Sequence, residues 1–136
     1  MANTKKDSPY ELLRTKEIIA ILDGDTKYGK YEFNDGTELQ IMMPYLSGPD
    51  LCGLSTLFGL PANYSWGGIK LSRWQYLDNL MIHCIEANRC SDLLAYLFDK
   101  KQFSKMLSGH EVDEINVAYE QITKSIMQEI NGVLFF

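Results

Sequence analysis

Apolar side chains recur at helical spacing over most of the chain, and the clearest stripe follows Ser72. The stripe consists of six residues, Trp74, Leu77, Leu80, Met81, Cys84 and Ile85. They are separated by three, three, one, three and one positions, which matches an α-helix with one buried face. Ser72 and Gln75 form a capping box at its start. The pattern predicts a helix that buries Trp74, Leu77, Leu80, Met81 and Cys84 together.

Another set of start and stop signals predicts a first helix over about 9–22. Ser8 and Glu11 form a capping box around a proline at the first helical position. Gly24 follows the last apolar residue and ends the helix. The polar residues 1–7 are expected to form a flexible lead.

Two short segments, 28–33 and 37–42, flank Asn34-Asp35-Gly36, a composition that favours a tight turn with positive φ. Apolar and polar residues alternate in the second segment, so one of its faces can be buried. We expect a β-hairpin at 28–42. Because two strands alone are marginal in water, the hairpin must lie on the helices or pair with something outside this chain.

Two shorter helices are predicted, one before and one after the helix that follows Ser72 in the chain. Ser47 begins the first of them, with an acidic residue three positions later, and Gly59 ends it. Ser91 is expected to cap the second, which runs through Phe98. A break near Lys100 and a helical continuation beyond it complete this part of the chain.

The last predicted helix spans about 111–130, and Asn131-Gly132 is a favourable stop signal. The residues after it, 133–136, are all apolar, whereas free termini are usually polar. We therefore expect a single domain over 8–132, with 133–136 as the start of a downstream domain.

Composition supports a folded domain. The chain has 136 residues, of which 46% are hydrophobic and 23% charged, with six Phe, eight Tyr and two Trp. The predicted fold is mainly α (α+β), a compact helical domain of five to six helices with one small β-hairpin. A formal net charge of −5 removes the general attraction to phosphate that most nucleic-acid binders show.

The sequence also bears on location. The start of the chain has no apolar stretch behind a basic segment, and no run of 18 apolar residues occurs anywhere, so we expect a cytoplasmic protein without a membrane segment. Cys52, Cys84 and Cys90 are an odd number within apolar helical patterns, which favours reduced thiols.

Residues with catalytic chemistry are few. His83 and Cys84 are adjacent on a helix and point about 100° apart, and no second pair completes a metal site with Cys90. His110 is expected to be a solvent-facing loop residue. The acidic residues at 111–114 are typical of the first turn of a helix. We therefore predict no catalytic residue, no cofactor and no metal.

The loop aromatics Tyr45, Tyr64 and Trp66 stand beside prolines and glycines. Such residues either fill a core or form a binding surface, and both interpretations stay open. Lys70 and Arg73 could form a basic strip next to them, or simply a solvated face. With the apolar end added, the candidate interaction surface comprises Tyr64, Trp66, Lys70, Arg73, Leu134, Phe135 and Phe136.

Three stretches, MMPYLSGPDLCGLSTLFGLP, SRWQYLDNLMIHCI and the closing EINGVLFF, resemble the N-terminal region of AbiJ-type abortive infection proteins of bacteria. The resemblance covers roughly half of the chain. It implies a phage-defence protein in which a variable front domain precedes a HEPN-like ribonuclease domain. That ribonuclease motif has an arginine and a histidine on one helix with four to six residues between them. None of the three arginines of this chain, Arg14, Arg73 and Arg89, has a histidine at this spacing, so the resemblance implies a non-catalytic front domain.

Three hypotheses follow in order. The first is a sensor or adaptor domain that binds a partner or regulates an attached effector, with a downstream domain, a separate protein or a second copy as partner. The second is a nucleic-acid-binding module in which 49–58 and the helix from Arg73 act like a helix-turn-helix, although their connection of about fourteen residues is far longer than the usual turn. An enzyme ranks third.

Overall fold

The computed structural model describes residues 9–64 and 71–134, without the side chains of Pro9 and Leu134. Its elements, in chain order, are the 3-10 helix η1 (Pro9–Arg14), α1 (Lys16–Leu22), β1 (Lys30–Glu32), β2 (Glu38–Gln40), α2 (Gly48–Leu57), α3 (Arg73–Glu86), α4 (Cys90–Leu97), the 3-10 helix η2 (Lys100–Phe103) and α5 (Val112–Leu134). The predicted fold class, a mainly helical domain with one small antiparallel hairpin, is confirmed.

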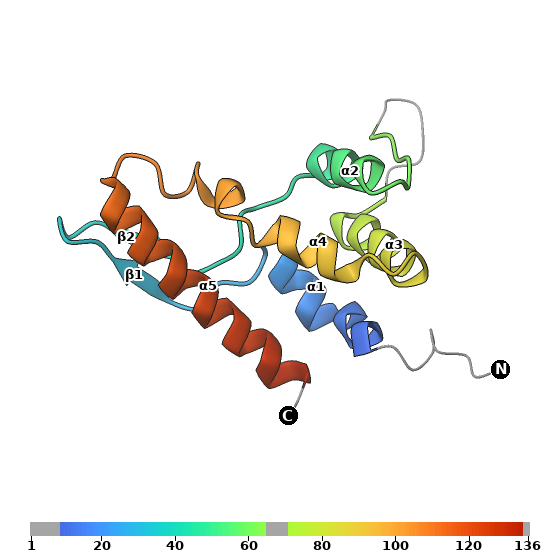
Figure 1. The fold of residues 1–136 in the computed structure, drawn as a ribbon, viewed down its shortest axis with the longest axis horizontal. Helices are drawn as coiled ribbons and strands as arrows, with labels where there is room; N and C mark the ends of the chain where they lie inside the picture. The colour runs from blue at the N-terminus through green and yellow to red at the C-terminus, as the bar shows by residue number, and fades with distance from the viewer. Residues whose placement is uncertain (1–8, 65–70, 135–136) are drawn as a thin grey trace.

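Helix α3 packs against η1, α1, α2 and α4, and this group forms the right half of the molecule in Figure 1. Leu77, Leu80, Met81 and Cys84 are fully buried, which confirms the predicted face. Trp74 packs against the same core but is only partly buried, so its full burial was predicted wrongly. It is the second residue of the helix and so lies in its first turn.

The first helix differs from its prediction because Thr15 interrupts it. Thr15 adopts an extended conformation, and its hydroxyl accepts a hydrogen bond from the Ile18 N–H. The chain therefore forms η1 first and starts a separate helix, α1, after this internal cap. The expected cap, Ser8, and the lead 1–7 lie outside the described residues.

The hairpin pairs Tyr31 with Leu39, and it packs on the helical part of the molecule, which is the first of the two alternatives that the sequence left open (Figure 1). Two contacts fix its turn to the start of α5. The Phe33 ring stacks on the His110 ring with centroids 3.6 Å apart, and the Asn34 N–H donates to a Glu114 carboxylate oxygen at 3.1 Å. His110 is thus half-buried, and its expected solvent-facing position is corrected.

Helix α4 begins at Cys90 rather than after Ser91. The tight link from α3 places Asn88 at a φ of 57°, and the Arg89 N–H bonds back to the Cys84 carbonyl, so α4 starts directly after Arg89. Arg89 occupies the N-cap position without a side-chain hydrogen bond. The prediction of Ser91 as a cap was therefore wrong.

Ser72, which caps α3, and Ser91, which does not cap α4, provide a matched test of capping. The Ser72 hydroxyl accepts a hydrogen bond from the Gln75 N–H, and the Gln75 side chain accepts one from the Ser72 N–H. We expect Ser72→Ala to lower the free energy of unfolding by about 0.5–2 kcal/mol. Ser91→Ala, which removes an exposed hydroxyl with no capping role, should cost much less. Chemical denaturation of both variants makes the comparison, and equal losses would reject the capping assignment.

Helix α5 runs to Leu134, through the predicted stop at Asn131-Gly132. The prediction fails because Val133 packs against the core, so tertiary packing outweighs the roughly 1 kcal/mol that glycine costs inside a helix. The expected boundary at 132 therefore falls inside a helix. Phe135 and Phe136 lie outside the described residues.

Candidate functional site

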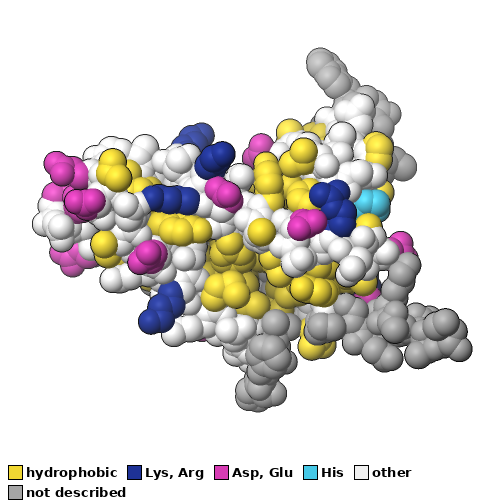
Figure 2. Space-filling model, in the orientation of Figure 1, with side chains coloured by type: hydrophobic (Ala, Val, Ile, Leu, Met, Phe, Trp, Pro, Cys, Tyr) yellow, Lys and Arg dark blue, Asp and Glu magenta, His cyan; other side chains and the backbone are white. Residues whose placement is uncertain are grey.

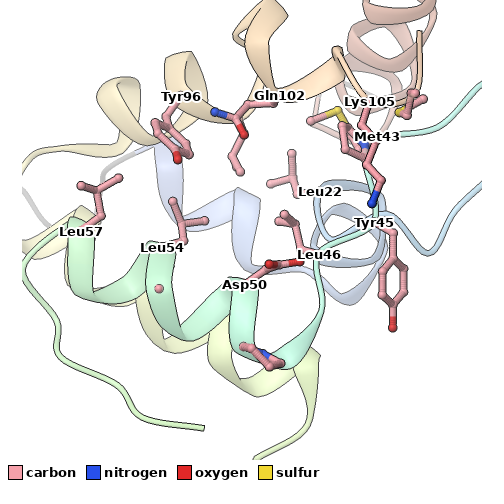
Figure 3. A pocket seen from close by; sticks show the side chains of 15 residues that line it. Leu22, Met43, Tyr45, Leu46, Asp50, Leu54, Leu57, Tyr96, Gln102 and Lys105 are labelled. Carbon is pink, nitrogen blue, oxygen red and sulfur yellow. The ribbon is translucent and has the colours of Figure 1, made fainter. Parts of the chain in front are cut away.

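A groove of about 880 Å³ lies between α2 and α4 (Figure 3). Its walls are α2 on one side, and the end of α4 with residues 102–106 on the other. The lining is completed by Leu22 of α1 and by residues 43–46. Residues 43–46 are called the wall segment below. We call this hollow the α2–α4 groove.

Exposed apolar side chains gather along this groove. Tyr45, Leu57 and Tyr96 are 59%, 60% and 38% exposed. They are three of the eight large hydrophobic residues that are exposed in the described part of the chain, and all three line the groove. In the view of Figure 3, Leu57 and Tyr96 lie at one end, and Tyr45 and Lys105 lie at the other.

The α2 wall is built by a capped, largely apolar helix. The Ser47 hydroxyl accepts from the Asp50 N–H, and the Asp50 carboxylate accepts from the Ser47 N–H, which forms the predicted capping box. Leu54 is nearly buried at 5% exposed and anchors the helix, whereas Leu57 projects into solvent. Gly53 meets no atom within 4 Å of its Cβ position, so another backbone can approach this wall closely.

The lining of the groove includes one cationic side chain, that of Lys105, at one end. Among the described residues, no carboxylate lies within ion-pair distance of the Lys105 ammonium. The carboxylate of Asp50, on the opposite wall, is already committed in part to the helix cap. Lys105 is thus the cation that an occupant of the groove would meet.

Arg73 holds the wall segment in place from the start of α3. Its Nε donates to the Leu46 carbonyl oxygen at 2.6 Å, and its guanidinium carbon lies 3.9 Å from the centre of the Tyr45 ring. Its other nitrogens donate to the Asp23 carbonyl oxygen at 2.6 Å and to the Asp25 carboxylate at 2.7 Å. A basic strip and a solvated face were the two alternatives for Arg73, and both are corrected for this residue: its guanidinium is bound within the chain.

Asp23 is the buried charge of this cluster, with only 1% of its surface exposed. Burial, and after it repulsion from Asp25, raise the pKa of the Asp23 carboxyl, Arg73 lowers it, and the net result is a pKa of about 6. Gly24, next to it, has a φ of 90°, and a Cβ there would lie 2.6 Å from the Tyr45 Cα. The wall segment therefore sits directly on the Asp23–Gly24 backbone.

The remaining predicted surface residues are only partly placed. Tyr64 is 37% exposed, and its ring lies over Gly48 and 5.9 Å from the Tyr76 ring, away from the α2–α4 groove. Trp66, Lys70, Phe135, Phe136 and the side chain of Leu134 lie outside the described residues. Tyr64 and Arg73 are thus the two members of the predicted surface whose side chains the structure describes.

Sequence reasoning missed Leu57, Tyr96 and Lys105. Leu57 and Tyr96 stand at helical spacing with buried residues and carry the same signal as a core position. Only Tyr45 was singled out, because it stands beside a proline in a non-helical stretch.

A second, smaller hollow of about 440 Å³ lies between η1, α4 and the end of α5, and we call it the α4–α5 hollow. Its lining includes Leu94, Phe98, Met127 and Ile130. Figure 2 shows hydrophobic side chains on this face, between α5 at the left and the α1 and α4 side at the right. The Tyr119 hydroxyl at its edge donates to the Phe98 carbonyl oxygen, so this polar group is already bound.

The histidines and thiols have structural surroundings. His83 Nε2 lies 3.0 Å from the Phe58 carbonyl oxygen on the flank of α3. Cys52, Cys84 and Cys90 are buried free thiols, as predicted, and burial raises the pKa of Cys90 to about 11. Within 9–64 and 71–134, no group of three His, Cys, Asp or Glu side chains could hold a metal ion.

No protein-family model, curated protein or solved structure matches this chain. Within the described part of the chain, none of the helices has the length and apolar character needed to cross a membrane.

Proposed function

We propose that this chain is a protein-binding domain of the sensor or adaptor type, and that the α2–α4 groove is its binding site. The observation that carries the proposal is the position of Tyr45, Leu57 and Tyr96. These exposed apolar side chains line the α2–α4 groove, where a partner would remove them from water. Aromatic and aliphatic anchors in a concave surface are the usual centre of a protein interface.

The chemistry of the groove favours an amphipathic segment, such as one helix of a partner. Leu57 and Tyr96 offer an apolar end, and Gly53 lets a backbone approach the α2 wall. Lys105 at the other end favours a segment that carries an acidic residue beside its apolar ones.

The sequence resemblance supplies a setting for this proposal. In an AbiJ-type abortive infection protein, the segment would belong to an attached effector domain or to a phage or host protein. The domain would then be non-catalytic and act by binding or by holding the effector inactive. This assignment rests on the sequence stretches quoted above and stays a proposal.

Nucleic-acid binding is the weaker candidate. Arg73, at the start of the supposed recognition helix, is bound to Asp23, Asp25 and Leu46. On the face shown in Figure 2, Lys and Arg side chains are interspersed with Asp and Glu and form no continuous basic strip.

A peptide selection tests the proposed function. The immobilised domain is used to select peptides from a random display library, and the affinity of a selected peptide is then measured by calorimetry. We expect Leu57→Glu to weaken binding at least tenfold, because it places a charge in the apolar end of the groove. The matched control is Val112→Glu, the same change at a residue that is 70% exposed on α5, and it should leave the affinity unchanged.

Two results would count against the groove as the binding site. One is equal binding by wild type and Leu57→Glu, with circular dichroism showing that the variant is folded. The other is an equal loss in Leu57→Glu and Val112→Glu, which would indicate a general effect of charge.

A further inference from the structure

The wall segment packs on the backbone of Asp23 and Gly24, and Asp23 is buried. The Leu46 N–H donates to the Asp23 carbonyl oxygen at 3.1 Å, and Arg73 bridges the carbonyl oxygens of Leu46 and Asp23. The close packing of Tyr45 on Gly24 covers the same place. Lifting the wall segment would break these contacts and let water reach Asp23.

The Asp23 carboxylate lacks a close cation although Arg73 stands beside it. Its Oδ1 accepts the Asp25 N–H at 3.1 Å but lies 3.8 Å from the nearest Arg73 nitrogen. Arg73 donates its short hydrogen bonds to the carbonyl oxygens of Leu46 and Asp23 and to the Asp25 carboxylate. The charged form of Asp23 is therefore desolvated without a full ion pair, which favours the protonated form.

The charged groups that act on Asp23 are few. Asp25, on its own loop, repels the carboxylate, and Arg73, from α3, attracts it. The wall segment, Met43 to Leu46, brings no carboxylate or amine toward it.

We infer that the wall segment is a proton-linked strap: closed over the Asp23–Gly24 backbone it keeps the Asp23 carboxyl out of water, and a rise in pH, which favours a hydrated carboxylate, favours the open strap. Because the wall segment lines the α2–α4 groove, its opening would change the shape of the groove. The importance of that change for binding rests on the proposed function, whereas the pH-dependent opening does not.

The direction follows from the two states of Asp23. Closed, its pKa is about 6; open and hydrated, it returns toward the ordinary value of 3.8. Between these values the closed form binds more protons, so opening releases a proton and a rise in pH favours it. From about pH 5 to about pH 7, the opening equilibrium should increase roughly tenfold.

Hydrogen exchange of the Leu46 amide measures this opening, because that N–H is bonded to Asp23 only in the closed strap. Protection factors, corrected for the intrinsic pH dependence of exchange, are compared by NMR at about pH 5 and about pH 7. We expect protection of Leu46 to fall roughly tenfold over this interval. The amide of Leu80, in the buried centre of α3, should be protected far more strongly at both values.

Two variants separate Asp23 from other carboxylates. Asp23→Asn keeps an oxygen that can accept the Asp25 N–H but cannot titrate, so protection of Leu46 should become independent of pH. Asp35→Asn, in the exposed hairpin turn, is the matched control and should keep the dependence of the wild type.

Three outcomes would overturn the strap. Protection of Leu46 that does not change with pH is one. Equal protection of Leu46 and Leu80 is another, because the wall would then open only with global unfolding. The third is a carboxyl-carbon NMR titration of wild-type Asp23 that gives the ordinary aspartate pKa. None of these measurements needs a partner, so their failure is separate from a failure of the peptide selection.

Discussion

Leu80→Ala should lower the free energy of unfolding by about 2–5 kcal/mol. Leu80 is fully buried at the centre of α3, between the elements that pack around this helix. Its removal leaves a cavity that the surrounding helices can fill only in part. Since small domains are stable by about 5–15 kcal/mol, this single change removes a large share of the total.

The control for this prediction is Leu57→Ala, the same deletion on the neighbouring helix α2. Leu57 is 60% exposed, so its loss should change stability by only about 0.5 kcal/mol. Urea denaturation of both variants gives the comparison. An unchanged midpoint for Leu80→Ala would contradict the placement of this face of α3 in the core.

Arg73→Met should cost about 3–5 kcal/mol at neutral pH. The change leaves Asp23 buried without a nearby cation, and it removes the donors that satisfy the carbonyl oxygens of Leu46 and Asp23. Adding Asp23→Asn to Arg73→Met should recover part of the loss, because the uncompensated charge is then gone. Urea denaturation of the single and double variants measures both effects.

Arg89→Met is the matched control for Arg73→Met. Arg89 also lies over an aromatic ring, that of Phe58, and faces a carboxylate, that of Asp92, but its side chain is 44% exposed. The cost should be no more than about 1 kcal/mol. Equal costs for Arg73→Met and Arg89→Met would show that the Arg73 cluster does not hold the wall segment.

Local signals in the sequence were sufficient for much of the fold. The caps at Ser47 and Ser72 were predicted correctly because a capping box involves residues only three positions apart. The predictions at Ser91 and Asn131-Gly132 failed where packing or a tight link outweighed the local preference.

The groove could not be predicted in the same way. Arg73 meets its partners Leu46, Asp25 and Asp23 at separations of 27, 48 and 50 residues, and no local pattern records such distances. Leu57 and Tyr96 follow the helical period of buried positions, yet the tertiary arrangement leaves them exposed.

The most direct test of the α2–α4 groove as the binding site is the methyl NMR spectrum of the domain during titration with a selected peptide. The groove predicts the largest shifts at the methyl groups of Leu54 and Leu57, which line the α2 wall. Shifts confined to Met127 and Ile130, in the α4–α5 hollow, would contradict it.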